Sequence, residues 1–337
     1  MVGHHINCDT LHVLINSSLY AKDLKFPEDW SHRLNFILPN QLQWRGSLDL
    51  FRLLTPAQRP EVLMAYLGTE DSVSGFHRCL SATVALNRVI DSAVEGPATL
   101  CFGTDGDSQA AYDTFMDSLD KSPHTDWFSV SIDQLRTAKF PIYTTTQRTG
   151  DLVVFPAATA HQVLNLAPVV TKAVWNILHG TSVDLFMSYI QPAYQRLCHP
   201  DTARVHLAVL ASILELNDNQ DSTSSQDMVK LLYILKNLID EEEITDRHSL
   251  IIKRVGAPEG TVVECNFCGL AIWNRHLHCQ ECTDFDLCMY CYSMGRSCKH
   301  VSSYCWVEAY SRDHCLEILT QAQRTLEIGS DEFTPRE

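Results

Sequence analysis

Cysteines are concentrated in one short stretch of this 337-residue chain. Eight of the thirteen lie between Cys265 and Cys305, and six of these form three CxxC pairs: Cys265/Cys268, Cys279/Cys282 and Cys288/Cys291. Each CxxC pair presents two thiolates to one tetrahedral ion, and Zn²⁺ favours sulfur and imidazole ligands. With Cys298 and His300 the pairs supply eight ligands, so the stretch predicts two closed zinc sites. Because so short a segment buries little apolar surface, we expect metal to supply most of its folding energy, about 10 kcal/mol per site.

The same stretch resembles a ZZ-type zinc finger. Its segment TDFDLCMYCY, residues 283–292, follows the D-[FY]-D-L-C-x-x-C signature of that family. The resemblance implies that one zinc is held by Cys265, Cys268, Cys288 and Cys291. The other zinc would take Cys279, Cys282 and two late residues, for which Cys298 and His300 are favoured and Cys305 is the alternative. His276 and His278 lie close enough in sequence to compete, although a surface or packing role is simpler for both.

The resemblance to a ZZ-type finger also predicts a binding partner for the chain. ZZ-type fingers are protein-interaction modules, some of which bind histone tails, and the net charge of −15 is compatible with a basic peptide. Asp284 and Asp286 either contact such a peptide or cap turns beside the zinc, and the second role is simpler. Residues 253–308 hold five Lys or Arg against six Asp or Glu, so no basic stripe predicts direct nucleic-acid binding.

Short β-rich runs occupy the middle of the chain, from about Ser72 to Leu178. Runs such as HRCLSATVALNRVI and VVTKAVWNIL are separated by Gly, Asp and Pro turns, and two helical patterns, at 108–121 and 131–138, interrupt them. Many short strands with few long helices predict a mainly β fold, a barrel or sandwich with added helices.

Two amphipathic helices are predicted after Pro200, at 201–216 and 227–243, with a polar loop between them. We expect them to form a spacer that packs on the barrel, with the acidic run Glu241 to Glu243 as a solvated helix end. The predicted organisation is an N-terminal helical and loop region (1–71), the barrel core (72–195), the helical spacer (196–255), the zinc finger (256–310) and a C-terminal helix and tail (311–337).

The β-rich part resembles the JmjC family of Fe(II) and 2-oxoglutarate oxygenases. The carrying segments are SGFHRCLSATVALN, residues 74–87, and GDLVVFPAATAHQVLNLAPVVTKAVWN, residues 150–176. The resemblance covers most of residues 40–215 and implies a double-stranded β-helix, with His77 and His161 as the iron histidines and Asn87 near the cosubstrate. Lys172 and Asn176 share a face of the last strand, which would let Lys172 pair with the distal carboxylate of 2-oxoglutarate.

Cys79 stands where the family has Asp or Glu. Such enzymes hold iron through two histidines and a carboxylate, and the carboxylate follows the first histidine by two residues so that both point to one face. A cysteine is soft and mostly protonated near neutral pH, so lost or reduced turnover is the expected result. Thiolate ligation of iron, or a carboxylate donated from elsewhere, with Asp91 as a candidate, are the alternatives.

Two functions follow as hypotheses. The first is a chromatin-type JmjC protein that serves as a binding or scaffolding module, with a degenerate iron site and a finger that recruits partners. The second is an active 2-oxoglutarate-dependent oxygenase, a histone lysine demethylase or protein hydroxylase. The expected cofactors are two zinc ions, with Fe²⁺ and 2-oxoglutarate dependent on which hypothesis holds. Without a signal-peptide pattern or a long apolar run, we expect no membrane contact and an intracellular, nuclear location.

Overall fold

The computed structural model describes residues 19–125, 127–218, 226–245, 252–254 and 262–327. The chain divides into two compact units. One contains the residues up to Gly46 together with Glu61–Ile177, and the other contains Ser47–Pro60 and the residues from Leu178 onward.

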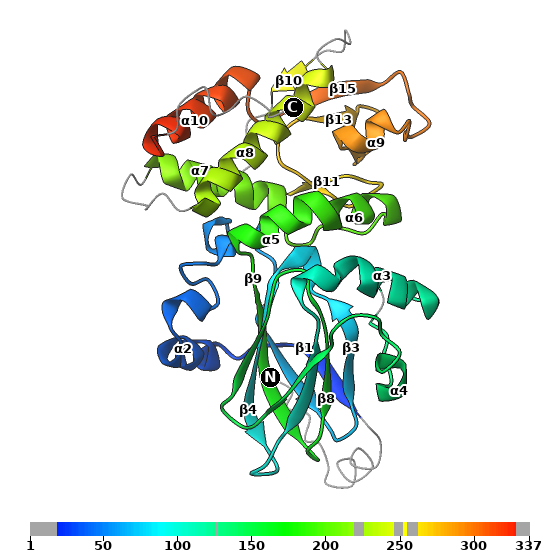
Figure 1. Cartoon of the computed structure of the whole chain (residues 1–337). Helices are drawn as coiled ribbons and strands as arrows, with labels where there is room; N and C mark the ends of the chain where they lie inside the picture. The colour runs from blue at the N-terminus through cyan, green and yellow to red at the C-terminus, as the bar shows by residue number, and fades with distance from the viewer. Residues whose placement is uncertain (1–18, 126, 219–225, 246–251, 255–261, 328–337) are drawn as a thin grey trace, which may run out of the picture. The chain divides into compact units, whose positions relative to one another are not determined.

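Two antiparallel sheets form the first unit (Figure 1). The five-stranded sheet has the order β1 (Tyr20–Lys25), β2 (Met64–Gly68), β9 (Val170–Ile177), β4 (Val84–Ser92) and β7 (Leu152–Phe155). The four-stranded sheet has the order β3 (Val73–Arg78), β8 (Ala160–Asn165), β5 (Thr99–Gly103) and β6 (Tyr143–Gln147). The mainly β fold predicted from the sequence is confirmed.

Side chains from both sheets meet between them. Ala85 and Phe155 of the five-stranded sheet share an apolar cluster with Cys101 and Val163 of the four-stranded sheet. The outer faces are covered by helices. α2 (Glu28–Ile37) packs over Leu86 and Trp175, whereas α3 (Gln109–Ser118) and α4 (Ile132–Leu135) belong to the cluster around Phe76. Short 3₁₀ turns at Asn40–Leu42, Leu80–Ala82 and Gly106–Ser108 complete the unit.

The strands reach further toward the N-terminus than the sequence prediction placed them. β1 and β2 lie within residues 1–71, which were predicted to be helical and loop, yet β2 pairs along its whole length with β9. β1 is mostly exposed and interrupted by a bulge between Ala21 and Leu24, so it lacks the alternation that marks a strand. At the other end, the last strand stops at Ile177, and residues 178–195 belong to the second unit.

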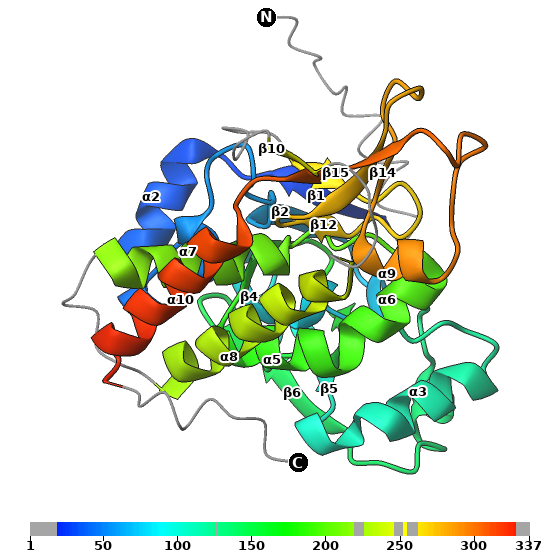
Figure 2. The same ribbon diagram turned by 90° about the horizontal axis from the view of Figure 1, so that it is seen from above.

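The second unit contains the remaining helices (Figure 2). They are the 3₁₀ turn η2 (Leu50–Leu53), α5 (Gly180–Leu185), the π-helical turn Phe186–Ile190, α6 (Gln191–Leu197), α7 (Val205–Asp218), α8 (Gln226–Glu241), the 3₁₀ turn η6 (Glu242–Thr245) and α10 (Arg312–Thr325). Asp201 Oδ2 accepts a hydrogen bond of 2.8 Å from the Val205 amide and so caps α7. Within the described segments, no helix is both long and apolar enough to cross a bilayer.

The cysteine-rich stretch folds against these helices. It forms a four-stranded sheet of order β10 (Ile252–Arg254), β15 (Tyr304–Glu308), β13 (His276–Cys279) and β14 (Asp286–Leu287), a two-stranded ribbon of β11 (Val263–Glu264) with β12 (Ala271–Ile272), and the short helix α9 (Met289–Ser293). α7 contacts α8, α10 and β12, so the helices predicted to be a spacer belong to the same compact unit as the cysteines. Leu277, Leu287 and Trp306 are buried among the cysteines, which is more apolar burial than the sequence analysis expected.

Candidate metal centres

The two histidines expected at an iron site face each other across neighbouring strands. His77 on β3 pairs directly with His161 on β8, and their ring centroids lie 4.4 Å apart. His77 stacks on Trp127 at 3.7 Å, and His161 stacks on Phe155 at 4.0 Å. Both imidazoles are therefore held in fixed orientations by aromatic rings.

Backbone geometry sets which nitrogen of His77 is available. Its Nδ1 lies 2.7 Å from the carbonyl oxygen of Gly75, which can only accept, so Nδ1 carries the proton and Nε2 keeps a free lone pair. Gly75 is required here because a Cβ would lie 2.3 Å from the carbonyl oxygen of Trp127. Burial lowers the pKa of His77 to about 4 and, with His77 nearby, holds the pKa of His161 well below its ordinary value. Both rings are neutral at pH 7, the form that binds a metal.

Cys79 completes the cluster. Its sulfur and one nitrogen of each histidine all lie within 4.8 Å of one another. Arg78, between His77 and Cys79, points the other way and pairs with Asp113 of α3 at 2.6 Å. Cys79 is partly exposed, but burial of its thiol raises the pKa of the thiol to about 12.

The residues expected to hold a cosubstrate line the inner face of the five-stranded sheet. Asn87 on β4 and Lys172 and Asn176 on β9 alternate with residues that pack outward under α2. The Asn87 Oδ1 atom is buried and accepts no hydrogen bond from the described residues, whereas Asn176 donates to Thr83 Oγ1 at 3.0 Å. An unsatisfied acceptor is costly inside a protein, so the Asn87 Oδ1 atom is available to a hydrogen-bond donor on a ligand.

Lys172 is a buried cation in neutral surroundings. Its side chain is fully buried, and Nζ donates to Tyr20 Oη at 2.8 Å and to Asn165 Oδ1 at 3.0 Å. Tyr20 Oη also lies 2.8 Å from Ser74 Oγ. Burial lowers the pKa of Lys172 to about 7. An ammonium group has three hydrogens, and two are used here, so an incoming carboxylate would find both a charge and a donor.

Two further clusters lie in the cysteine-rich stretch. Cys265, Cys268, Cys288 and Cys291 are all buried, with their sulfur atoms within 4.8 Å of one another. Gly269 follows the first pair with a φ of 66°, which lets its amide donate to the Cys265 carbonyl at 2.8 Å and close the turn. Arg296 donates to the Cys291 sulfur at 3.2 Å, a contact that stabilises a thiolate.

The second cluster contains two of the three candidates for its last two ligands. Cys279, Cys282, Cys298 and His300 bring their ligand atoms within 4.8 Å of one another. Cys305 is buried on β15 outside this cluster. The other competitors, His276 and His278, instead approach Asp286 Oδ1 at 3.4 and 2.9 Å. Asp286 is therefore a buried partner of two histidines, and Asp284 is exposed.

Known families match both parts of the chain. Residues 65–175 match the family model described as JmjC domain, hydroxylase, and residues 259–302 match the model of the ZZ-type zinc finger. The chain contains a JmjC domain and a ZZ-type zinc finger. It is also similar to C-module-binding factor A of Dictyostelium discoideum, with 24% identity over 311 residues that cover 83% of this chain and 31% of that protein. The chain thus spans about a third of the length of this relative.

The donor sets differ in how they fit the metals of these families. Both clusters of the zinc finger offer four sulfur or imidazole ligands, as structural zinc requires. The JmjC cluster does not fit Fe(II), because no carboxylate joins it among the described residues. Asp91 is exposed at the end of β4, so the proposed donation from this residue is not supported. Asp23 accepts a hydrogen bond of 3.0 Å from Tyr66 and is likewise outside the cluster.

Several residues around these centres carried no sequence signal. Tyr20 and Asn165 contact Lys172 from strands far apart in the chain, and Trp127 covers His77 from a loop. Glu242 lies in the acidic run predicted to be solvated, yet it is 7% exposed. It accepts hydrogen bonds from Asn274 Nδ2 at 2.7 Å and from the Arg275 amide at 2.8 Å.

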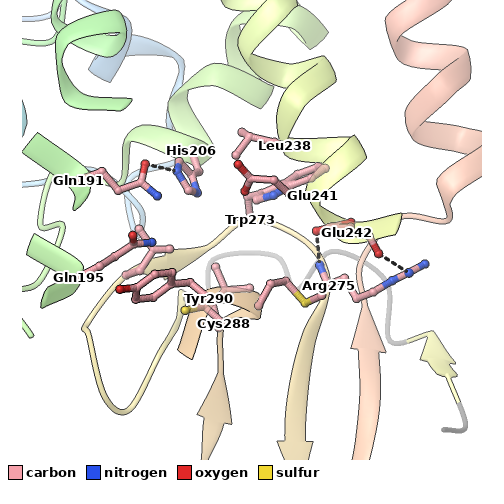
Figure 3. A pocket seen from close by; sticks show the side chains of 13 residues that line it. Gln191, Gln195, His206, Leu238, Glu241, Glu242, Trp273, Arg275, Cys288 and Tyr290 are labelled. Carbon is pink, nitrogen blue, oxygen red and sulfur yellow. Dashed lines mark hydrogen bonds between the residues drawn. The ribbon is translucent and has the colours of Figure 1, made fainter. Parts of the chain in front are cut away.

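Glu242 lines a pocket between the helices of the second unit and the zinc finger. Figure 3 shows Glu242 and Arg275 on one side of it, and Tyr290 and Gln191, which is paired with His206, on the other side. Arg275 also pairs with Glu308 at 2.9 Å, and both side chains are buried. Burial raises the pKa of Glu242 to about 7 despite these donors.

This pKa makes the stability of the second unit depend on pH. The folded protein keeps a proton on Glu242 up to about pH 7, whereas the unfolded chain releases it near its ordinary pKa of 4.5, so stability falls as the pH rises between these values. From pH 5 to pH 8, wild type should lose about 2 kcal/mol relative to Glu242→Gln in urea unfolding. Glu243→Gln, at an exposed neighbour that pairs with Arg312, is the control. Parallel pH curves for wild type and Glu242→Gln would contradict the prediction.

Proposed function

We propose that this chain is a protein-binding scaffold in which the JmjC domain has lost oxygenase turnover and the zinc finger binds a peptide partner. The observation that carries the proposal is Cys79, whose sulfur lies beside the two histidines where Fe(II) needs a carboxylate. A carboxylate is a hard ligand that compensates the charge of the ion, and a neutral thiol does neither. Two histidines alone hold Fe(II) weakly.

The zinc finger holds two zinc ions in this proposal. Cys265, Cys268, Cys288 and Cys291 bind the first ion, and Cys279, Cys282, Cys298 and His300 bind the second. Zinc fixes the loops between these ligands, since four bonds to one ion replace the apolar burial that a small domain lacks.

The partner of the finger is a basic peptide, with histone tails as the candidate class and the nucleus as the place of action. The net charge of −15 favours cationic partners over nucleic acid, and Asp284 and Glu281 are exposed on the finger. The Dictyostelium relative is named as a binding factor, and a binding role for this chain agrees with that name.

An assay of turnover tests the JmjC part. With Fe(II), ascorbate and 2-oxoglutarate, the wild-type chain should form succinate no faster than His161→Ala. Cys79→Asp should bind Fe(II) under anaerobic conditions at least about tenfold more tightly than wild type, because the carboxylate adds a bond and a compensating charge. Equilibrium dialysis measures the binding, with His161→Ala as the control.

The alternative function is an active oxygenase acting on a methylated lysine or another protein side chain. It is favoured by Lys172, a buried cation with a donor hydrogen to spare, which suits the distal carboxylate of 2-oxoglutarate. Lys172 and Asn87 would hold the cosubstrate, which supplies the two electrons that dioxygen activation needs. Succinate formation by wild type well above the His161→Ala level would replace the scaffold proposal with this one.

A further inference from the structure

The donors of the JmjC cluster are two imidazole nitrogens and one sulfur. We propose that His77, Cys79 and His161 form a third zinc site, inside the β-barrel, with one coordination position left open to a small ligand. This inference rests on the proposed loss of the iron site, and it assigns the barrel a metal that the usual histidine and carboxylate pattern does not select.

The chemistry of the donors favours zinc over iron. Thiolate is a soft ligand, and nitrogen and sulfur sites bind Zn²⁺ more tightly than Fe²⁺ in the usual order of divalent metals. Zn²⁺ displaces the proton of the Cys79 thiol to solvent, so two neutral imidazoles and one thiolate would leave a single positive charge on the complex. The chain needs zinc for its finger in any case, so it folds where zinc is supplied.

The geometry is close to that of a bound site. Zinc bonds of 2.0–2.3 Å in a tetrahedron place ligand atoms roughly 3.4–3.6 Å apart, and the three ligand atoms already lie within 4.8 Å of one another. The hydrogen bond from His77 Nδ1 to the Gly75 carbonyl supplies the outer support typical of zinc-bound histidines.

The fourth position has no protein ligand among the described residues. The cluster contains three ligating side chains, which is the number that open zinc sites use, with water or a ligand in fourth place. Trp127 and Phe155 stack on the outer sides of the two histidines and exclude solvent from them. The fourth position is therefore left to water or a small ligand, in contrast to the closed four-ligand clusters of the finger.

Zinc content tests the site directly. The purified 337-residue wild-type chain should retain about three zinc ions after dialysis, and Cys79→Ser and His161→Ala should retain about two, by elemental analysis. The matched control is Cys101→Ser, at a buried cysteine of the same barrel that lies outside the cluster, which should keep all three. Circular dichroism establishes that each variant is folded.

Cobalt substitution gives a second readout that does not depend on counting zinc. Co²⁺ bound to a thiolate has a charge-transfer band in the near ultraviolet, and the finger contributes equally to wild type and Cys79→Ser. The difference spectrum between the two should therefore contain one additional thiolate band, and Cys79→Asp should lose that band while it keeps cobalt. A wild-type chain with about two zinc ions and no difference band overturns the inference.

The outcomes separate this inference from the proposed function. Two zinc ions in wild type together with absent turnover would refute the third zinc site and leave the scaffold proposal standing. Iron retention with succinate formation would refute both. A wild-type barrel that takes up Cu²⁺ in preference to Zn²⁺, with an intense visible thiolate band, would keep the site but overturn its assignment to zinc.

Discussion

Cys288→Ser is expected to unfold the whole second unit and not the zinc finger alone. Cys288 is a buried member of the four-cysteine cluster and accepts a hydrogen bond from the Cys291 amide at the start of α9. Loss of one thiolate removes a large part of a zinc binding energy of about 10 kcal/mol, which is comparable with the entire stability of a typical domain.

The helices depend on the finger through specific contacts. Glu242, which follows α8 at the start of η6, binds Asn274 and Arg275, which directly precede β13, and Arg275 is held in turn by Glu308 of β15. Asn217 of α7 donates to the Ile318 carbonyl of α10 at 3.0 Å, and α7 also contacts β12. When the cysteine cluster opens, Glu242 loses its buried hydrogen-bond donors and Arg275 loses its ion pair with Glu308, and an unpaired buried charge is strongly destabilising.

Calorimetry and far-UV circular dichroism measure the effect. The transition of the second unit should disappear in Cys288→Ser with loss of helical signal, while the transition of the JmjC domain remains. Cys282→Ser, at a partly exposed ligand of the second cluster, should cost less, and Cys198→Ser, at an exposed cysteine outside both clusters, should cost nothing measurable. If Cys288→Ser left the helical signal unchanged, the helices would be shown to fold without the finger. Simultaneous loss of both transitions would contradict the independence of the two units.

Local chemistry explains which parts of the sites could be predicted from the sequence. The spacing within each CxxC pair and the two-residue offset of His77 and Cys79 are themselves geometric statements, whereas the grouping of the pairs into two sites and the place of His161 rested on the family resemblances. The shared inward direction of Lys172 and Asn176 on β9 could also be predicted, since alternate residues of a strand lie on one face.

Long-range contacts could not be predicted in this way. Lys172 contacts Tyr20, 152 residues earlier in the chain, because β1 forms the edge strand of the five-stranded sheet. The sequence of β1 has no pattern that predicts this pairing. Glu242 lies in a run of three acidic residues, and only tertiary packing decides that this one is buried beside Arg275 while its neighbours stay exposed. A run of acidic residues predicts that most of them are exposed to solvent. Whether one of them is buried depends on the residues that pack against it from elsewhere in the chain.

Lys172→Met is expected to stabilise the JmjC domain and, under the alternative function proposed above, to abolish binding of 2-oxoglutarate. The pKa of Lys172 is about 7 in the folded protein and near 10.5 in the unfolded chain. Below pH 7 the folded state must bury a charged ammonium among neutral groups, and this cost is relieved as the pH rises from 7 to 10.5, where only the folded protein releases the proton. Removal of the amine leaves Asn165 Oδ1 without its donor, which offsets part of the gain.

The net gain should be about 2 kcal/mol at pH 6 and smaller at pH 9, measured by urea unfolding. Under the alternative function, wild type should be further stabilised by added 2-oxoglutarate, since a ligand that binds only the folded state raises its stability with concentration. Lys172→Met should show no such rise. Lys25→Met, at an exposed lysine of β1 in the same sheet, is the matched control and should behave as wild type in both respects.

The two measurements on Lys172 separate a ligand site from a structural residue. A buried lysine retained for packing would lose stability when replaced, and ligand would stabilise wild type and Lys172→Met equally. A buried lysine that serves to bind an anion destabilises the ligand-free domain, because its ammonium group has no counterion until a carboxylate binds. If Lys172→Met were more stable than wild type and still stabilised by 2-oxoglutarate, Lys172 would be neither a packing residue nor a ligand-binding residue. The anion would then have to bind elsewhere in the domain.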